Sequence, residues 1–143
     1  MIKIGEIQDL KIVKRTDFGV YLGDETEKVL LPGKQVPEDA VIGDSVTVFI
    51  YRDSQDRLIA TTREPMLVLG QVARLEVKDT GKIGAFLDWG LEKDLFLPFK
   101  EQTYKVRPGD DCLVALYVDK SGRLCATMNV YKYLKGTTQY RRG

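Results

Sequence analysis

Two short stretches of the chain, FGVYL at residues 18–22 and IGAFL at residues 83–87, place bulky side chains around a glycine. Flat rings such as Phe18 and Tyr21 either fill a core or face solvent, where each ring can stack a nucleic-acid base for about 1–3 kcal/mol. Side chains three positions apart on a strand point to opposite faces, so both rings face outward only if the chain bends near Gly19. Taken alone, the stretch leaves both interpretations open.

The two stretches belong to a tandem duplication that covers most of the chain. Gly5 recurs as Gly70, and the segment VFIYRDSQDRLIATT recurs as ALYVDKSGRLCATMN. Leu31-Pro32 returns as Leu97-Pro98. Because order, spacing and turn residues are all kept, we predict two copies of one supersecondary unit.

Each copy reads as five short strands separated by turn residues, with a hairpin at DSQD or DKSG. The expected strands of the first copy are residues 4–13, 18–22, 28–32, 46–53 and 57–62. Those of the second are residues 70–77, 83–87, 94–98, 112–119 and 123–128. Five strands in about 60 residues with little helix are typical of a small Greek-key barrel of the OB type.

The predicted fold class is therefore all-β, with two tandem five-stranded OB-fold barrels and a short C-terminal helix. The expected divisions are a first barrel at 1–64, a linker at 65–69, a second barrel at 70–130, and a helix with a basic tail at 131–143. The helix is expected because Val130, Tyr131 and Leu134 have helical spacing.

Composition argues against an enzyme and against a bound metal or cofactor. The chain has no histidine, which removes the commonest general base and the commonest metal ligand. Cys112 and Cys125 have no zinc-ligand spacing, and we expect them to be small buried hydrophobes rather than a disulfide.

No apolar run is long enough for a membrane helix, and MIKIGEIQDL does not read as a signal peptide, so we expect a cytoplasmic protein.

The near-neutral charge is unevenly distributed along the chain. The net charge is −3 over residues 1–69, 0 over 70–130 and +4 over 131–143, which gives +1 for the whole. A nucleic-acid-binding protein needs a basic face rather than a basic average. Lys14 and Arg15 before the first aromatic stretch, and Lys78 and Lys82 before the second, occupy equivalent turns and could contact phosphates.

The aromatic-Gly-x-aromatic pattern, the later Gly-Asp and the D…R-[LI]-x-A hairpin resemble the RNA-binding barrel domain named after ribosomal protein S-one. The resemblance implies that Phe18, Tyr21 and Arg57 face RNA in the first copy, with Ile83, Phe86 and Arg123 at the same places in the second. The family's frequent histidine is replaced by Leu31 and Leu97. Asp53 and Asp119 match an acidic position whose alternative role is to close the hairpin by pairing with the arginine.

The LLP and FLP variants and the start MIKIGEIQDLKIVKRTDFGVYL resemble, more narrowly, the bacterial conserved virulence factor B family. That family carries successive S-one-like barrels and then a winged-helix domain, and the match covers residues 1–130. The chain is thus expected to be a fragment or a short relative. The resemblance implies RNA binding and an influence on gene expression.

These arguments predict a non-catalytic protein that binds single-stranded RNA across its barrel faces, with no membrane contact and an oligomeric state that the sequence does not define. The predicted RNA-binding residues are Lys14, Arg15, Phe18, Tyr21, Arg57, Lys78, Lys82, Phe86, Trp89 and Arg123. Trp89 would replace the ring missing at Ile83, or else be a hydrophobic anchor between the barrels. The alternative function is a protein-interaction module on the same surfaces, with Trp89, Phe99 and Tyr104 as its apolar contacts.

Overall fold

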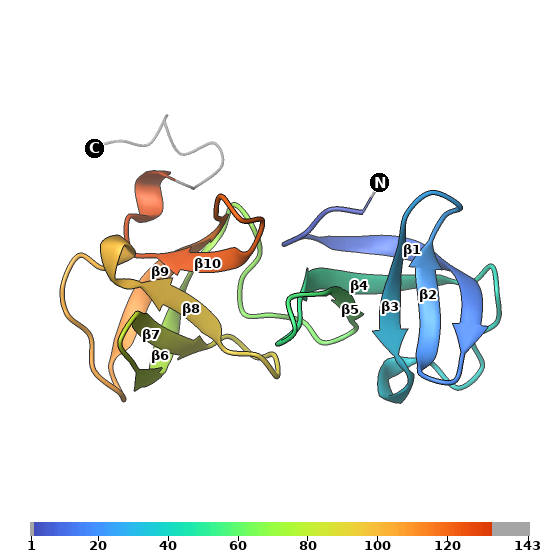
Figure 1. The fold of residues 1–143 in the computed structure, drawn as a ribbon, viewed down its shortest axis with the longest axis horizontal. Coiled ribbons are helices and arrows are strands. Elements are labelled where there is room, and N and C mark those ends of the chain that lie inside the picture. The colour runs from blue at the N-terminus through green and yellow to red at the C-terminus, as the bar shows by residue number, and fades with distance from the viewer. Residues whose placement is uncertain (1, 133–143) are drawn as a thin grey trace. The chain divides into compact units, whose positions relative to one another are not determined.

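The computed structural model describes residues 2–132, and these fold into two compact units that meet in sequence between Glu64 and Pro65 (Figure 1). Apart from short 3-10 turns, the regular structure of the described residues is entirely β-strand. The prediction of two five-stranded barrels is confirmed. Within residues 2–132, no helix is long and apolar enough to cross a membrane.

The first unit is a closed barrel with the strand order β1-β2-β3-β5-β4, in which β3 pairs with β5 in parallel and the other pairs are antiparallel. Its elements are β1 (Ile7–Thr16), β2 (Gly19–Gly23), β3 (Lys28–Pro32), the 3-10 turn η1 (Gly33–Gln35), β4 (Ser45–Arg52) and β5 (Leu58–Thr61). Alternate residues of every strand point inward, which is how a small barrel fills its interior with side chains. Ile12, Val20, Leu31, Val48 and Ala60 are among the buried core residues.

The second unit repeats this plan with the sheet order β10-β9-β6-β7-β8, and β8 packs beside β10. Its elements are β6 (Val72–Thr80), β7 (Gly84–Asp88), β8 (Leu95–Pro98), the 3-10 turn η2 (Phe99–Glu101), β9 (Asp111–Val118), β10 (Leu124–Thr127) and the 3-10 turn η3 (Val130–Lys132). The duplication includes an irregularity in strand pairing, a register shift that occurs at the equivalent place in both units. The register of β1 against β2 shifts between Ile12 and Lys14, and that of β6 against β7 shifts between Val77 and Asp79.

The predicted C-terminal helix is not found in the described residues. The chain forms the 3-10 turn η3 at Val130–Lys132, where the helix was expected to begin. Valine and tyrosine are weak helix formers, and the Val130 side chain is buried, so local packing outweighs the helical spacing. The rest of that prediction, residues 133–143, lies outside the described residues.

Candidate nucleic-acid interface

The turn between β1 and β2 holds the Phe18 ring in solvent. The Thr16 hydroxyl accepts a hydrogen bond from the Phe18 N–H at 3.2 Å and donates one to the Gly19 carbonyl at 3.1 Å. The Gly33 N–H donates to the Phe18 carbonyl at 2.9 Å, which ties the turn to η1. Phe18 is 79% exposed although its backbone is fixed on both sides. A rigid backbone carrying an exposed ring loses little entropy when a flat ligand stacks on it.

Gly19 is required because β3 approaches β2 too closely for any side chain. A Cβ at this position would lie 2.1 Å from the Leu31 carbonyl oxygen, and its φ of 147° disfavours other residues. Gly84 has the same role in the second unit, where a Cβ would lie 2.4 Å from the Leu97 carbonyl oxygen. The glycine in both aromatic stretches therefore allows the two neighbouring strands to pack closely. Phe18 does not follow the inward and outward alternation of strand side chains, because it lies in the turn between β1 and β2.

Tyr21 lies on the outer surface of the first barrel, as does its cross-strand neighbour Lys14. Tyr21 pairs with Lys14 of β1 and with Leu30 of β3, and Leu30 in turn pairs with Ile59 of β5. Paired residues share one side of a sheet, so these four side chains form one row across four strands. Tyr21, Leu30 and Ile59 are half-buried, which makes them a shallow apolar strip with the Lys14 ammonium at its edge.

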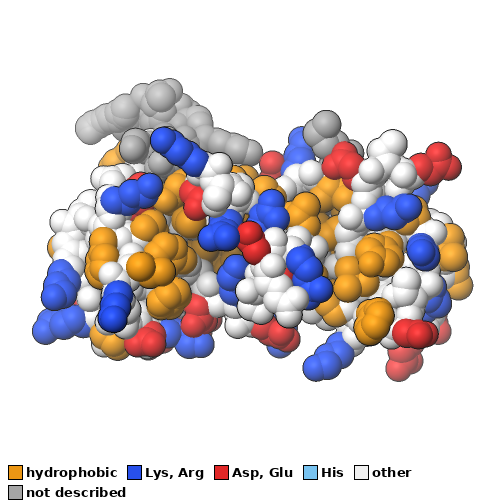
Figure 2. Space-filling view, viewed as in Figure 1, with side chains coloured by type: hydrophobic (Ala, Val, Ile, Leu, Met, Phe, Trp, Pro, Cys, Tyr) orange, Lys and Arg blue, Asp and Glu red, His pale blue; other side chains and the backbone are white. Residues whose placement is uncertain are grey.

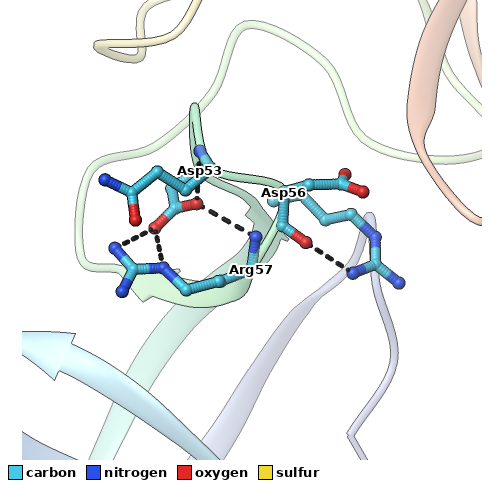
Figure 3. Close-up of polar contacts among 5 residues, drawn as sticks. Asp53, Asp56 and Arg57 are labelled. Atoms are coloured by element: carbon cyan, nitrogen blue, oxygen red, sulfur yellow. Dashed lines mark hydrogen bonds and ion pairs between the residues drawn. The ribbon is translucent and has the colours of Figure 1, made fainter.

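Arg15 and Arg57 already have partners within the first unit. The Arg15 guanidinium donates to the Ala40 carbonyl. Arg57 forms a salt bridge with Asp53 at 3.1 Å, and its Nε donates to the same carboxylate (Figure 3). The hairpin-closing role considered for the Asp-Arg pair is thus present in the structure.

Hydrogen bonds hold the pKa of Asp53 below its ordinary value. Partial burial by itself raises the pKa, but the backbone N–H groups of Arg57 and Gln55 and the Arg57 guanidinium together outweigh burial. Asp119 repeats the arrangement. Burial again raises its pKa, and the Ser121 hydroxyl and the backbone N–H groups of Arg123 and Ser121 lower it below the usual range. Both carboxylates organise their hairpin turns.

The second barrel has its own aromatic pair on the equivalent surface. Phe86 of β7 faces Phe96 of β8, with ring centroids 5.5 Å apart and planes inclined by 35°. Ile83 and Phe99 are exposed at the end of this strand pair, where the Phe99 N–H approaches the Ile83 carbonyl. Phe86 is also paired with Asp79, which stands where Lys14 stands in the first barrel.

Cations around the second face are accompanied by carboxylates. Lys78 forms a salt bridge with Asp94 at 3.3 Å, and both side chains are partly exposed, so the pair contributes little to stability. Lys82 and Arg123 are exposed at the ends of their hairpins. The second face thus offers rings with mixed charge, whereas the first offers rings beside Lys14.

Trp89 does not offer its ring to solvent. It is 2% exposed, and its indole N–H donates to the Lys93 carbonyl at 2.6 Å. The prediction that Trp89 replaces the ring missing at Ile83 therefore finds no support in the geometry. The ring that accompanies Phe86 is Phe96, which the sequence reasoning missed. When DLFLP is aligned with KVLLP, Phe96 occupies the position equivalent to Leu30. That alignment could have identified Phe96 as an additional ring of the second copy.

The two cysteines are buried free thiols, as the sequence predicts. Burial raises the pKa of the Cys125 thiol to about 12, with the neighbouring Asp119 carboxylate adding to the rise. Burial likewise raises the pKa of Cys112. Over residues 2–132 the structure contains no cluster of three or more His, Cys, Asp or Glu that could hold a metal ion.

Comparison with protein families identifies the repeated unit. The model of the S1 domain matches residues 4–63 and again residues 69–129. The chain belongs to the S1 domain family. Its two barrels are tandem S1 domains, homologous to the N-terminal part of the conserved virulence factor B and YitL proteins.

Two curated relatives place these S1 domains within longer proteins. The uncharacterized protein YitL of Bacillus subtilis is 36% identical over 128 residues, and conserved virulence factor B of Staphylococcus aureus is 26% identical over the same length. Each match covers 85% of this chain and 43% of the relative. The chain thus spans less than half the length of the curated relatives it matches.

A solved structure has the same fold as these S1 domains. It is a multidomain protein with nucleic acid binding domains from Streptococcus pneumoniae, and it is 23% identical to this chain. The superposition has a TM-score of 0.73 and covers 86% of this chain and 45% of the other. At this identity the likeness establishes the fold alone.

The outer strips of the two S1 domains differ in chemistry. Figure 2 shows hydrophobic side chains gathered over β2 and β3 in one unit and over β8 in the other, with Lys and Arg side chains near both. Exposed rings can stack unpaired bases, and nearby ammonium groups can contact phosphates. The first S1 domain combines the two features most directly, in Phe18, Tyr21 and Lys14.

Proposed function

We propose that this chain is a non-catalytic RNA-binding protein of the cytoplasm that influences gene expression by binding single-stranded RNA. Bases would stack on Phe18 and Tyr21 in the first S1 domain, and a phosphate would contact Lys14. Arg57 would contribute through its exposed guanidinium edge while paired with Asp53. In the second domain, Phe86 with Phe96 would form a further stacking site, bordered by Lys78, Lys82 and Arg123.

The observation that carries this proposal is the exposure of Phe18 on a hydrogen-bonded turn beside the row of Lys14, Tyr21 and Leu30. A core residue would not be 79% exposed, and the turn that carries the ring is held by hydrogen bonds from Thr16 and Gly33. Membership of the S1 family supports the same conclusion, because nucleic-acid binding is the role generally associated with that fold.

The test is a fluorescence anisotropy titration of a labelled oligouridylate of about 12 nucleotides, a length within the range that one or two OB folds contact. The double substitution Phe18→Ala/Tyr21→Ala should weaken binding at least about tenfold, because each stacked base contributes about 1–3 kcal/mol. Ile42→Ala is the control, since it removes another exposed apolar side chain of the same domain, one that carries no ring.

The proposal fails if the intact chain does not bind RNA at low salt, or if the double variant binds as tightly as the parent. Loss of folding is a separate outcome, and thermal unfolding of the variant separates it from loss of binding. Phe18 is exposed and Tyr21 is half-buried outside the core, so the variant should remain folded at the temperature of the titration, with a lower unfolding temperature than the parent.

A second candidate function is protein binding by the face of the second S1 domain. The observation that favours it is the apolar surface of Ile83, Phe86, Phe96 and Phe99, next to the carboxylates of Asp79 and Asp94. Carboxylates repel phosphates, whereas an apolar surface with mixed charge suits a polypeptide. Recovery of one stable protein partner after nuclease treatment, and its loss on Phe96→Ala, would favour this candidate.

A further inference from the structure

The second S1 domain has an open hollow on a side that does not belong to the stacking face. Its volume is about 290 Å³, and its walls come from β6, the loop after η2, β9 and the segment after β10. The lining residues are Arg74, Thr103, Tyr104, Leu113, Met128 and Val130. Arg74 of β6 pairs with Leu113 of β9, so both side chains point to the outer surface of the barrel.

The chemistry of this hollow suits a nucleotide. Tyr104 is 55% exposed and Leu113 46% exposed, which leaves a ring and an aliphatic surface open to solvent. Arg74 brings a planar guanidinium that can donate two parallel hydrogen bonds to a phosphate. A ring, an aliphatic surface and a cation together can bind a base and its phosphate.

The internal repeat shows that the barrel itself does not require these residues. In the first domain the pair equivalent to Arg74 and Leu113 is Asp9 and Thr47, at the same register, and the Thr47 hydroxyl donates to the Asp9 carboxylate. The aligned segments PEDAVIGD (37–44) and TYKVRPGD (103–110) place Glu38 where the second domain has Tyr104. At these three positions, carboxyl and hydroxyl groups in the first copy are replaced by a cation, a ring and an aliphatic side chain in the second.

Two neighbouring positions change in the same direction and one changes in the opposite direction. Asp39 corresponds to Lys105 and Glu64 to Val130, whereas Arg63, which lines the equivalent hollow of the first domain, corresponds to Asn129. With Asp9 and Glu38, four carboxylates of the first domain are thus replaced by two cations, a tyrosine and a valine. Because both copies form the same barrel, folding does not require the change in charge, and a cationic surface favours a negatively charged partner.

A row of carboxylates separates this hollow from the stacking face. Glu76 of β6 pairs with Asp88 of β7 on one side and with Asp111 of β9 on the other, so the three lie on one outer surface. Phosphates would be repelled there. Phe99 and Lys100 are exposed on η2, the turn that leads into the loop of the hollow.

We propose that this hollow binds one nucleotide of a single-stranded RNA, with the phosphate on Arg74 and the base against Tyr104 and Leu113. The inference rests on the proposed function, because it requires that the chain binds RNA. It assigns to the second domain a contact surface different from its Phe86 and Phe96 face.

The first test is an amide NMR titration of the unaltered chain with an oligouridylate of about 12 nucleotides. The inference predicts shifts at Arg74, Tyr104, Leu113 and Met128. Shifts at Phe18 and Tyr21 without any at the hollow would overturn the inference and leave the proposed function standing. Shifts at the hollow alone would support the inference and contradict the proposed stacking face. No shifts anywhere would overturn both.

The second test is the double substitution Arg74→Asp/Tyr104→Glu, which installs the residues of the first domain at the same barrel positions. RNA affinity should fall about tenfold, and the slope of log K against log salt should shrink by about 0.7 for the lost phosphate contact. Asp9→Asn/Glu38→Gln is the reciprocal variant, which removes two carboxylates from the first domain, and it should bind no more weakly than the parent. Unchanged affinity of the first variant would overturn the inference. If that variant does not fold, the titration of the unaltered chain decides.

Discussion

At the level of single residues, two adjacent cations differ in what they already contact. Arg15 donates to the Ala40 carbonyl and so joins β1 to the loop before β4. Lys14 is exposed and is paired across the sheet with Tyr21. Sequence alone treats the two as equivalent phosphate contacts, but the structure gives them different roles. Lys14 is the better candidate for phosphate, and Arg15 contributes to the fold.

Lys14→Gln should therefore weaken RNA binding and reduce the slope of log K against log salt by about 0.7, because one phosphate contact to a single strand is lost. Arg15→Gln should leave that slope nearly unchanged and lower the free energy of unfolding by about 1–3 kcal/mol, as the Ala40 carbonyl loses a charged donor. Anisotropy titrations between about 50 and 200 mM salt measure the slope. The reverse ranking of the two variants would contradict these roles.

The candidate site was only partly predictable at this scale. Tyr21 could be found because a ring two residues after the glycine recurs as Phe86, and Phe18 because it directly precedes Gly19 in the same stretch. Phe96 was missed because its partnership with Phe86 depends on which residues of β7 and β8 face each other. Trp89 was misplaced because nothing in its sequence neighbourhood reveals the hydrogen bond to the Lys93 carbonyl.

At the level of elements, the β1–β2 hairpin depends on one close backbone approach. Gly19→Ala would place a methyl group 2.1 Å from the Leu31 carbonyl oxygen, which β2 and β3 can relieve only by separating. We expect the first unit to lose at least about 2 kcal/mol of stability, since strain from φ adds to overpacking. Hydrogen exchange of the β2 and β3 amides measures this loss.

Gly43→Ala is the control for that substitution, because Gly43 also has positive φ but a Cβ there would have no neighbour within 4 Å. The stability that this variant loses should come from backbone strain alone and amount to about 1 kcal/mol. Equal losses for the two variants would show that the approach of β3 is not what requires glycine at position 19.

The hairpin turns of both barrels make stability depend on pH. The pKa values of Asp53 and Asp119 are lower in the folded chain than the ordinary aspartate value of about 3.9. The folded state therefore binds fewer protons than the unfolded state in this range. The stability they contribute is present above about pH 4 and is lost as pH falls through the folded-state pKa values.

Asp53→Asn/Asp119→Asn should flatten this acid dependence while keeping one amide oxygen for the turn N–H groups. Urea midpoints at about pH 4, 3 and 2 would fall less steeply for the variant than for the parent. Some dependence should remain, because hydrogen bonds from Glu27 and Thr26 lower the pKa of Asp24 to about 2. Identical slopes would contradict the assigned roles of the two aspartates.

At the level of the whole molecule, the chain uses one barrel twice and gives each copy a different surface. The fold could be predicted from sequence because the repeat, the glycines and the prolines Pro32 and Pro98 all specify the same strands in both copies. The surfaces could not be predicted from the sequence, because the charge next to each ring depends on which residues pair across the strands. Lys14 faces Tyr21, whereas Asp79 faces Phe86.

Ultraviolet cross-linking of the intact chain to oligouridylate, followed by trypsin digestion, tests most directly whether RNA lies on the first S1 domain. Cleavage after Arg15 and Lys28 releases residues 16–28, which contain both Phe18 and Tyr21. The account predicts that this peptide carries the main cross-link and loses it in the Phe18→Ala/Tyr21→Ala variant. Efficient cross-links found only in other peptides would contradict it.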